Sequence, residues 1–297
     1  MNPRQYLLPP KGEGMTQKFI MIASSKGGVG KSTAALGISH ALSSMGHSVL
    51  LCDLDFGNAC LDMLLGVQDS VVYTIQDVSA GKITAGDALV KIEKEAPKKK
   101  KILKSAKKPE GELWLLPSCA GGAGCIPSFG GEATGEREEL IAGAVKAAAQ
   151  EISADFVIID TGAGLNRAVN IGADLSDIAL VVTGQMPVAL RSAEATVARL
   201  YEMGVGDIRL IINSFDARGV IDESRKGLFG VIDESRAPLL GVIPYDYNLM
   251  LTHERLLPRG NDAECAFSNI ARRLCGENVP IFSGMKRMRK LKNKICL

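Results

Sequence analysis

Short apolar segments, without a regular alternation of polar residues, recur along the whole chain. Several of the stretches between them are long enough for helices, at 31–46, 136–152 and 188–203. Continuous apolar strands are typical of parallel sheets that helices cover on both faces. We therefore expect an α/β fold with a doubly wound, mostly parallel sheet. The predicted strands are 18–24, 48–55, 112–118, 155–161, 178–184, 208–214 and 239–244.

One internal segment and both ends interrupt this rhythm. Residues 91–111 are rich in lysine and contain two prolines, which indicates a solvated loop inserted in the domain. No apolar run approaches the roughly 18 residues that a membrane-spanning helix needs, and the start of the chain has no long apolar core. We expect a cytoplasmic protein with an N-terminal extension at 1–16, one α/β domain at 17–275 and a basic tail at 276–297.

The charge is distributed unevenly. The formal net charge is only +2, but residues 91–108 contribute +7 and residues 282–297 contribute +6, which leaves the remainder at −11. An acidic body argues against nucleic acid as a general partner. The seven cysteines form an odd number at irregular spacings, which favours reduced thiols.

The segment "SSKGGVGKST" (24–33) follows a predicted strand and precedes a predicted helix, the setting in which a glycine-rich loop binds phosphate. Glycines allow the backbone to turn tightly and to direct its amides at phosphate oxygens. We expect Lys31 to reach the β- and γ-phosphates and the Ser32 hydroxyl to bind Mg²⁺. The predicted ATP-binding residues of this loop are Lys26, Gly27, Gly28, Val29, Gly30, Lys31, Ser32 and Thr33.

Lys26 lies on the other side of the glycines, where an ordinary phosphate loop has no fixed lysine. This second lysine resembles the deviant Walker A box of the MinD/ParA ATPase family. In that family two subunits enclose two ATP molecules, and each signature lysine contacts the nucleotide of the partner. The resemblance implies an ATP-dependent homodimer in which Lys26 couples dimerisation to the γ-phosphate.

Further motifs of that family follow in its usual order. In "LCDLDFGNACLD" (51–62), the resemblance implies that Asp53 orders Mg²⁺ through water and that Asp55 orients the attacking water. "VIIDTGAG" (157–164) resembles the family's Walker B and switch segment, with Asp160 as a magnesium residue and Gly164 as a mobile switch residue. Here Gly162 stands where the family more often has proline, which implies a looser switch.

The resemblance also indicates which residues contact the adenine base of ATP. It implies that Asn213 contacts adenine and that the backbone at Pro244 flanks it. The segment "TGQMP" (183–187) departs from the family pattern because it lacks an acidic residue, which puts the usual partner contacts in doubt there. Taken together, the motifs imply an ATPase that converts ATP and water to ADP and phosphate with Mg²⁺, with Lys26, Lys31 and Asp55 as its catalytic residues.

Apolar residues recur at helical spacing in the tail, with basic residues largely around them. A basic amphipathic helix is typical of an anchor that lies in the plane of an anionic membrane surface. A packed terminal helix and a disordered basic tail are the alternative interpretations. The predicted membrane residues are Met285, Met288, Leu291, Ile295, Lys286, Arg287 and Lys290.

A membrane-binding tail favours the MinD subgroup, which also ends in such a helix. That resemblance implies a cytoplasmic protein that cycles to the inner face of the cell membrane, places the division site and has partners of the MinE or MinC type. A flagellar-number regulator of the FlhG type and a DNA- or cargo-positioning ATPase of the ParA type are the alternatives. An iron–sulfur reductase of the nitrogenase type would need cysteines around the switch, and none lies between Asp160 and Cys265.

Overall fold

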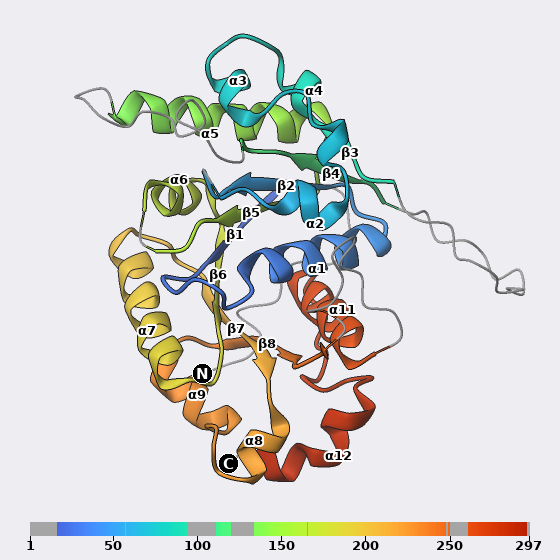
Figure 1. Cartoon of the computed structure of the whole chain (residues 1–297), viewed down its shortest axis with the longest axis vertical. Helices are drawn as coiled ribbons and strands as arrows, with labels where there is room; N and C mark the ends of the chain where they lie inside the picture. Colours follow the sequence, from blue (N-terminus) through green and yellow to red (C-terminus); the bar gives the residue numbers. More distant parts are fainter. Residues whose placement is uncertain are drawn as a thin grey trace, which may run out of the picture.

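A single sheet with the strand order β3-β4-β2-β5-β1-β6-β7-β8 forms the centre of the protein (Figure 1). The structure is a computed structural model that describes residues 17–56, 58–93, 111–119, 134–164, 166–247, 249 and 261–295. All neighbouring strands are parallel except β3 and β4, which confirms the predicted mostly parallel sheet. The strands are β1 Lys18–Ala23, β2 Val49–Leu54, β3 Val90–Lys91, β4 Leu113–Leu116, β5 Phe156–Thr161, β6 Ile178–Thr183, β7 Ile208–Phe215 and β8 Leu239–Pro244.

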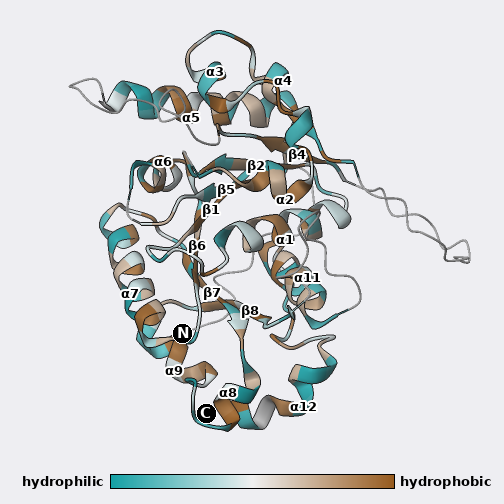
Figure 2. Cartoon of the chain, viewed as in Figure 1, coloured by the Kyte–Doolittle hydropathy of each residue, from teal (hydrophilic) through white to brown (hydrophobic). Residues whose placement is uncertain are grey.

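The central strands β2, β5 and β6 are buried at every position. Their sequences are hydrophobic apart from polar residues near the carboxyl ends, and Figure 2 shows the apolar colouring of these strands. Such strands need helices on both faces, since neither set of alternate side chains can be left in water. The helices are α1 Lys31–Ser44, α2 Leu61–Leu65, η2 Gln68–Ser70, α3 Ile75–Ser79, α4 Ala85–Ala88, α5 Thr134–Glu151, α6 Arg167–Leu175, α7 Pro187–Glu202, α8 Ala217–Ile221, α9 Leu228–Ser235, α11 Asp262–Leu274 and α12 Lys286–Ile295.

Helices α1 and α11 pack together on one face of the sheet, while α6 and α7 lie on the other (Figure 1). Close contacts hold α11 in place. A side chain at Gly37 of α1 would lie only 2.4 Å from the ring of Phe267, and one at Gly241 of β8 would lie 2.3 Å from Ile270. This packing fixes the position of α1, whose N-terminus carries the glycine-rich loop.

Both edges of the sheet are short or covered. The sequence did not predict β3, which has only two residues and runs antiparallel to β4, where Lys91 forms an ion pair with Glu112. At the other edge Arg273 donates a hydrogen bond from Nη1 to the carbonyl of Leu240 in β8, at 2.8 Å. Of the predicted lysine-rich loop at 91–111, residues 94–110 lie outside the described residues, as does the N-terminal extension at 1–16.

The cysteines are not all reduced. Cys52, Cys60, Cys265 and Cys275 form no disulfide, as expected, whereas Cys119 is disulfide-bonded. The expectation of reduced thiols throughout was therefore wrong for Cys119. Within the described part of the chain, no helix combines the length and the apolar character needed to cross a bilayer.

Candidate functional site

The site forms where three adjacent parallel strands end together. β1 leads into the glycine-rich loop, while β2 and β5 carry Asp53 and Asp160, which are direct partners in the strand register. Carboxyl ends of parallel strands meet at one edge of a sheet, where ligands commonly bind in open α/β folds. The sheet order therefore gathers residues that lie far apart in the sequence.

Two glycines of the loop have left-handed backbones, with φ of 74° at Gly28 and 92° at Gly30. Gly30 is further restricted, because a side chain there would lie 2.0 Å from Nδ2 of Asn213. That nitrogen donates a hydrogen bond to the carbonyl of Val29 at 2.8 Å. Only glycine fits this turn. The turn places its backbone amides beside the N-terminus of α1, and a helix N-terminus is a favourable position for phosphate.

Lys31 and Ser32 begin α1 and lie close to Asp160. The Lys31 side chain is only 7% exposed, and its charge lowers the pKa of Asp160. The Ser32 hydroxyl lies near the Asp160 carboxylate and the Cys60 thiol and lowers the pKa of both groups. No motif in the sequence pointed to Cys60. Burial raises the pKa of this thiol to about 11, which keeps it neutral beside the two acids.

Asp160 is the least satisfied polar group in the site. It is 1% exposed, and its Oδ1 atom has no hydrogen-bond partner. Burial raises its pKa to about 7. An orphaned buried carboxylate oxygen indicates a missing ligand, since buried polar groups are otherwise hydrogen-bonded.

Asp53 is buried as well, but its oxygens are occupied. Burial raises its pKa to about 6, while three backbone amides donate to its carboxylate, from Asp55 at 2.9 Å, Cys60 at 3.1 Å and Leu61 at 3.2 Å. These bonds shape the loop after β2. The predicted role of Asp53 at magnesium therefore requires water between the carboxylate and the ion.

The residues around Asp160 fit a magnesium ion. Mg²⁺ prefers oxygen ligands and is usually held by one or two protein groups together with water and substrate phosphates. Ser32 and Asp160 offer such oxygens side by side. Among the described residues there is no group of three or more His, Cys, Asp or Glu residues placed to hold a metal. A nucleotide would therefore have to supply the remaining ligands.

The switch segment lies against Asp55. A side chain at Gly162 would lie 2.6 Å from Oδ1 of Asp55, so the glycine allows the carboxylate to approach the backbone. Gly164 has φ of 94°, and its amide donates to the carbonyl of Ser24 at 3.2 Å. The replacement of proline by Gly162 thus has a steric reason: it leaves room for the group that is expected to orient water.

Lys26 lies at the rim of the loop and is partly exposed. In the part of the chain that the structure describes, its ammonium group forms no ion pair. The backbone before it is tied to α7, because Thr196 Oγ1 accepts from the Ser25 amide at 3.1 Å and the hydroxyls of Ser25 and Ser192 are 2.6 Å apart. The charge of Lys26 is therefore available to a ligand or to a second protein molecule.

Asn213 and Pro244 line one cavity of about 1130 Å³ at the ends of β7 and β8. The same cavity is lined by Met288 and Leu291 of α12, so the residues expected to contact the base lie next to the tail. Lys26, Lys31, Asp53, Asp55 and Asp160 do not line it. The cavity is therefore separate from the glycine-rich loop and from the aspartates at the ends of β2 and β5.

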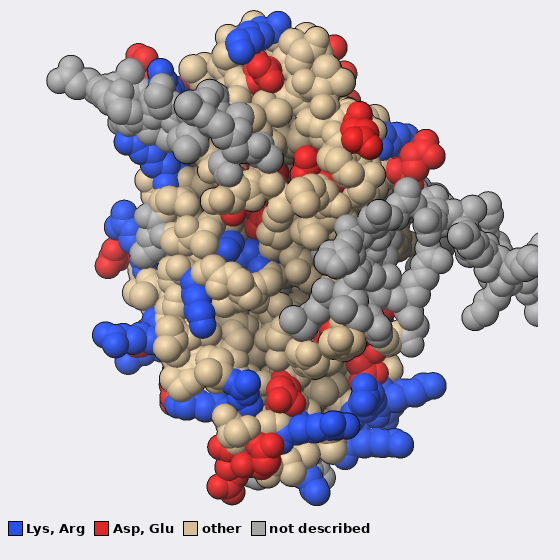
Figure 3. Space-filling model, viewed as in Figure 1, with Lys and Arg blue, Asp and Glu red and all other residues tan. Residues whose placement is uncertain are grey.

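The tail forms the predicted amphipathic helix, but its apolar side faces the protein. Met285, Met288 and Ile295 are 1%, 3% and 0% exposed, and Leu291 packs beside them. The basic residues Lys286, Arg287 and Lys290 are exposed, and Figure 3 shows basic side chains gathered at this end of the molecule.

The start of α12 is held by Asp262. Its carboxylate accepts hydrogen bonds from the amides of Lys286, Arg287 and Met288, at 3.0, 3.1 and 3.3 Å. The expectation of a free anchor therefore does not describe this conformation. The physical reason is the burial of apolar side chains, each of which contributes about 1.5–3 kcal/mol when it leaves water.

A family model for the CobQ/CobB/MinD/ParA nucleotide-binding domain matches residues 20–258. The chain belongs to this family. Its sequence is similar to the septum site-determining protein MinD of Synechocystis, with 28% identity over 94% of this chain and 97% of that protein. It is also similar to MinD of Thermotoga maritima, with 31% identity over 88% of this chain and 89% of the relative.

Solved structures of the family have the same fold. MinD in the MinC:MinD complex of Aquifex aeolicus aligns with a TM-score of 0.72 and 28% identity, covering 89% of this chain and 97% of that chain. MinD of Pyrococcus horikoshii with Mg-ADP aligns with a TM-score of 0.67 and 25% identity, covering 87% and 96%.

One departure from the family pattern has a structural role here. Gln185, in "TGQMP", is buried, and its Nε2 donates to the carbonyl of Lys226 at 2.8 Å. Its Oε1 accepts from the amide of Asp216 at 2.6 Å. Gln185 thus joins the ends of β6 and β7 to the segment before α9. The sequence showed only that an acid was missing, and the new hydrogen bonds depend on the fold.

Proposed function

We propose that this protein is an ATPase of the MinD type that dimerises with ATP, binds anionic membrane reversibly in that state and regulates placement of the division site. The observation that carries the proposal is Lys26, a second lysine at the rim of a complete phosphate loop whose ammonium group forms no ion pair with the described residues. In the same described part of the chain, Asp160 has a buried oxygen without a partner. A phosphate loop that served only one subunit would need Lys31 alone.

Hydrolysis follows from positioning and charge. The loop amides and Lys31 hold the phosphates, and Asp55 orients the water that attacks the γ-phosphate in line with the leaving oxygen. Ser32 and Asp160 would hold Mg²⁺, which would supply positive charge to the phosphate oxygens. The reaction gives ADP and phosphate. Asp55 can shift when the segment from Gly162 to Gly164 moves, because the two are in contact.

Dimerisation makes the site complete. Lys26 of each subunit contacts the nucleotide of its partner, so the facing subunit contributes the second cation. Two facing copies bring together the glycine-rich loops and the start of α7. Hydrolysis removes the γ-phosphate and thereby weakens the dimer, which ends the active state.

Membrane binding needs α12 to leave the position in which it is packed here. Each exposed basic residue near an anionic surface contributes about 1 kcal/mol, so one tail binds weakly. A dimer presents two tails, and the second binds at a raised effective concentration. Because two tails bind the membrane more strongly than one, the protein would be a cytoplasmic monomer that cycles to the inner face of the membrane as an ATP dimer.

A partner of the MinC type is supported by the similarity to MinD in the MinC:MinD complex. An activator of the MinE type would end the cycle.

Variants of Lys31 and Lys26 separate ATP binding from ATP-dependent dimerisation. We expect Lys31→Ala to lose ATP binding, hydrolysis and ATP-dependent dimerisation together. Lys26→Ala should still bind ATP as a monomer but fail to dimerise, as judged by light scattering with a non-hydrolysable ATP analogue. Lys82→Ala, which removes an exposed lysine paired with Asp77, is the control and should behave as the wild type. A Lys26→Ala dimer of normal affinity would refute the proposed role of Lys26.

The membrane step is tested by co-sedimentation with anionic liposomes. The full chain and a chain ending at Pro280 are compared with ATP and with ADP. Binding that needs both ATP and the tail supports the proposal, and absence of binding in every state refutes it. Asp262→Ala, which removes the acceptor that holds the start of α12, should raise binding in ADP several-fold. Binding to DNA in place of liposomes would favour the ParA-type alternative.

A further inference from the structure

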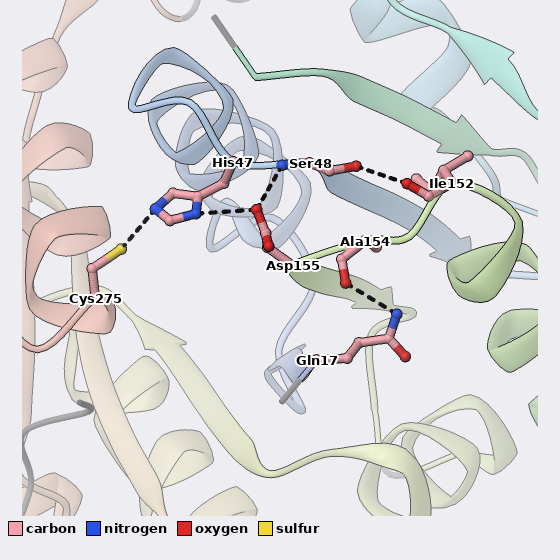
Figure 4. A network of polar contacts seen from close by, with 7 residues as sticks. All are labelled: Gln17, His47, Ser48, Ile152, Ala154, Asp155 and Cys275. Atoms are coloured by element: carbon pink, nitrogen blue, oxygen red, sulfur yellow. Dashed lines mark hydrogen bonds and ion pairs between the residues drawn. The ribbon is translucent and has the colours of Figure 1, made fainter. Parts of the chain in front are cut away.

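A thiol, an imidazole and a carboxylate lie in line near the amino ends of the strands, opposite the edge that carries the glycine-rich loop (Figure 4). Cys275 Sγ lies 3.4 Å from Nε2 of His47, and Nδ1 of the same ring lies 3.3 Å from Oδ2 of Asp155. The residues come from the end of α11, the turn before β2 and the turn before β5. None of them takes part in the nucleotide site.

The surroundings of His47 fix the orientation of its ring. The side chain is 7% exposed, and the ring meets Phe156 edge to face at 5.0 Å. Asp155 is held in turn, because its Oδ2 also accepts from the amide of Ser48 at 3.0 Å. A carboxylate at Nδ1 favours the tautomer with the proton on that nitrogen, which leaves Nε2 to accept from the thiol.

This arrangement provides the thiol with a base. Histidine within hydrogen-bond reach of a cysteine takes up the thiol proton and stabilises the thiolate, the reactive form. The C-terminal end of α11, where Cys275 is the capping residue, opposes the negative charge. Arg272 and Arg273 in the last turn of the helix counter that effect. Cys275 is partly exposed, so small molecules can reach it.

We propose that Cys275 is a reactive thiol and a site of reversible oxidation by hydroperoxides. The thiolate sulfur attacks one peroxide oxygen, an S–O bond forms and the O–O bond breaks. The sulfur is oxidised to a sulfenic acid, the peroxide is reduced, and the departing oxygen takes the proton held by His47 to leave as water or alcohol. A cellular thiol then reduces the sulfenic acid.

The same helix contains a matched reference. Cys265 is also a partly exposed free thiol of α11. Its pKa is raised by burial and by the charges of Asp262 and Glu264. The described structure gives it no histidine partner. The two thiols, ten positions apart, therefore differ in their surroundings: Cys275 contacts a histidine, whereas two carboxylates lie near Cys265.

The test treats the full chain with hydrogen peroxide and dimedone and quantifies labelled peptides by mass spectrometry. We expect Cys275 to be labelled at least about tenfold faster than Cys265, Cys60 and Cys52. His47→Gln should lower the rate at Cys275 to that of Cys265 while leaving Cys265 unchanged. Cys275→Ser should abolish that label and leave ATP hydrolysis intact.

Folding is checked by thermal unfolding of each variant. Should His47→Gln unfold, Asp155→Asn serves as the second variant, because it keeps the side-chain volume and disturbs the imidazole. The wild-type comparison of Cys275 with Cys265 needs no variant at all. Equal labelling of these two thiols in the wild type would overturn the proposal, as would an unchanged rate at Cys275 in a folded His47→Gln protein.

Discussion

Two aspartates at opposite ends of β5 show how one strand serves both stability and function. Asp155 precedes the strand and is held by two contacts of one oxygen: Oδ2 accepts from the Ser48 amide and contacts His47. Asp160 lies near the other end, 1% exposed, with Oδ1 unpartnered. The carboxylates are chemically identical, and only their surroundings differ. The end with satisfied polar groups holds the fold, and the end with a missing partner is the place for a ligand.

The largest expected effect is on catalysis. Asp160→Asn removes a negative charge where Mg²⁺ is expected, and loss of one such electrostatic contact costs about 10²–10³-fold in rate. We expect ATP hydrolysis to fall by that factor and magnesium to stop strengthening nucleotide binding, measured by calorimetry. Asp155→Asn is the matched control at the other end of the strand. If both variants lost hydrolysis equally, the functional contrast between the two ends would be false.

The second effect is on stability, and here the larger change is expected at Asp155 and not at Asp160. Asp155→Ala removes the acceptor of the Ser48 amide and the partner of His47, which should cost about 1–3 kcal/mol in the free energy of unfolding. Nucleotide affinity should stay unchanged. Denaturant unfolding measures the loss, with Asp69→Ala on the exposed η2 turn as the surface control. A loss of nucleotide affinity without a loss of stability would contradict this assignment.

A third, smaller effect is the pH dependence that Asp160 gives to the free energy of unfolding. Burial raises the folded-state pKa of Asp160 from 3.8 to about 7. Between these values the folded state holds more protons than the unfolded state, so without Mg²⁺ the stability falls as pH rises. One proton gives a limiting slope of about 1.4 kcal/mol per pH unit. Asp160→Asn should reduce this slope, measured by urea unfolding from pH 4 to pH 7, and the raised pKa of Asp53, about 6, accounts for the part that remains.

The smallest expected effect on stability comes from Gly162. A methyl group there would displace only the ends of two side chains, those of Asp55 and Asn166, so Gly162→Ala should change the free energy of unfolding by less than about 0.5 kcal/mol. Hydrolysis should nevertheless fall roughly tenfold, since misplaced catalytic groups are costly. Gly135→Ala, at a position with open space around it, is the control. Normal hydrolysis in Gly162→Ala would show that the position of Asp55 is not limiting.

The sequence predicted the sheet well because buried parallel strands leave a direct signature. All seven predicted strands are present, and the loop from Lys26 to Thr33 joins β1 to α1 as expected. β3 was missed because two residues, Val90 and Lys91, give no periodic pattern. The tail illustrates another limit: helical spacing shows that Met288 and Ile295 share a face, but it cannot show which surface that face covers.

Contacts between distant segments were also beyond the sequence. His47 and Cys275 meet only because the turn before β2 and the end of α11 are brought together by the sheet. The orphaned oxygen of Asp160 is likewise a property of packing, although the family motif indicated the residue itself. Motifs therefore identified the residues of the nucleotide site, while their unsatisfied or satisfied state required the structure.

The two edges of the sheet are short or covered, and this limits how copies of the protein can associate. Exposed strand edges invite further strands and aggregation. Here β3 is only two residues long, and β8 ends in proline and has its Leu240 carbonyl occupied by Arg273. Growth by adding strands is thus disfavoured at both ends. Reversible self-association therefore has to use a surface formed by side chains and not the edges of the sheet. The affinity of such a surface can be controlled by a bound small molecule.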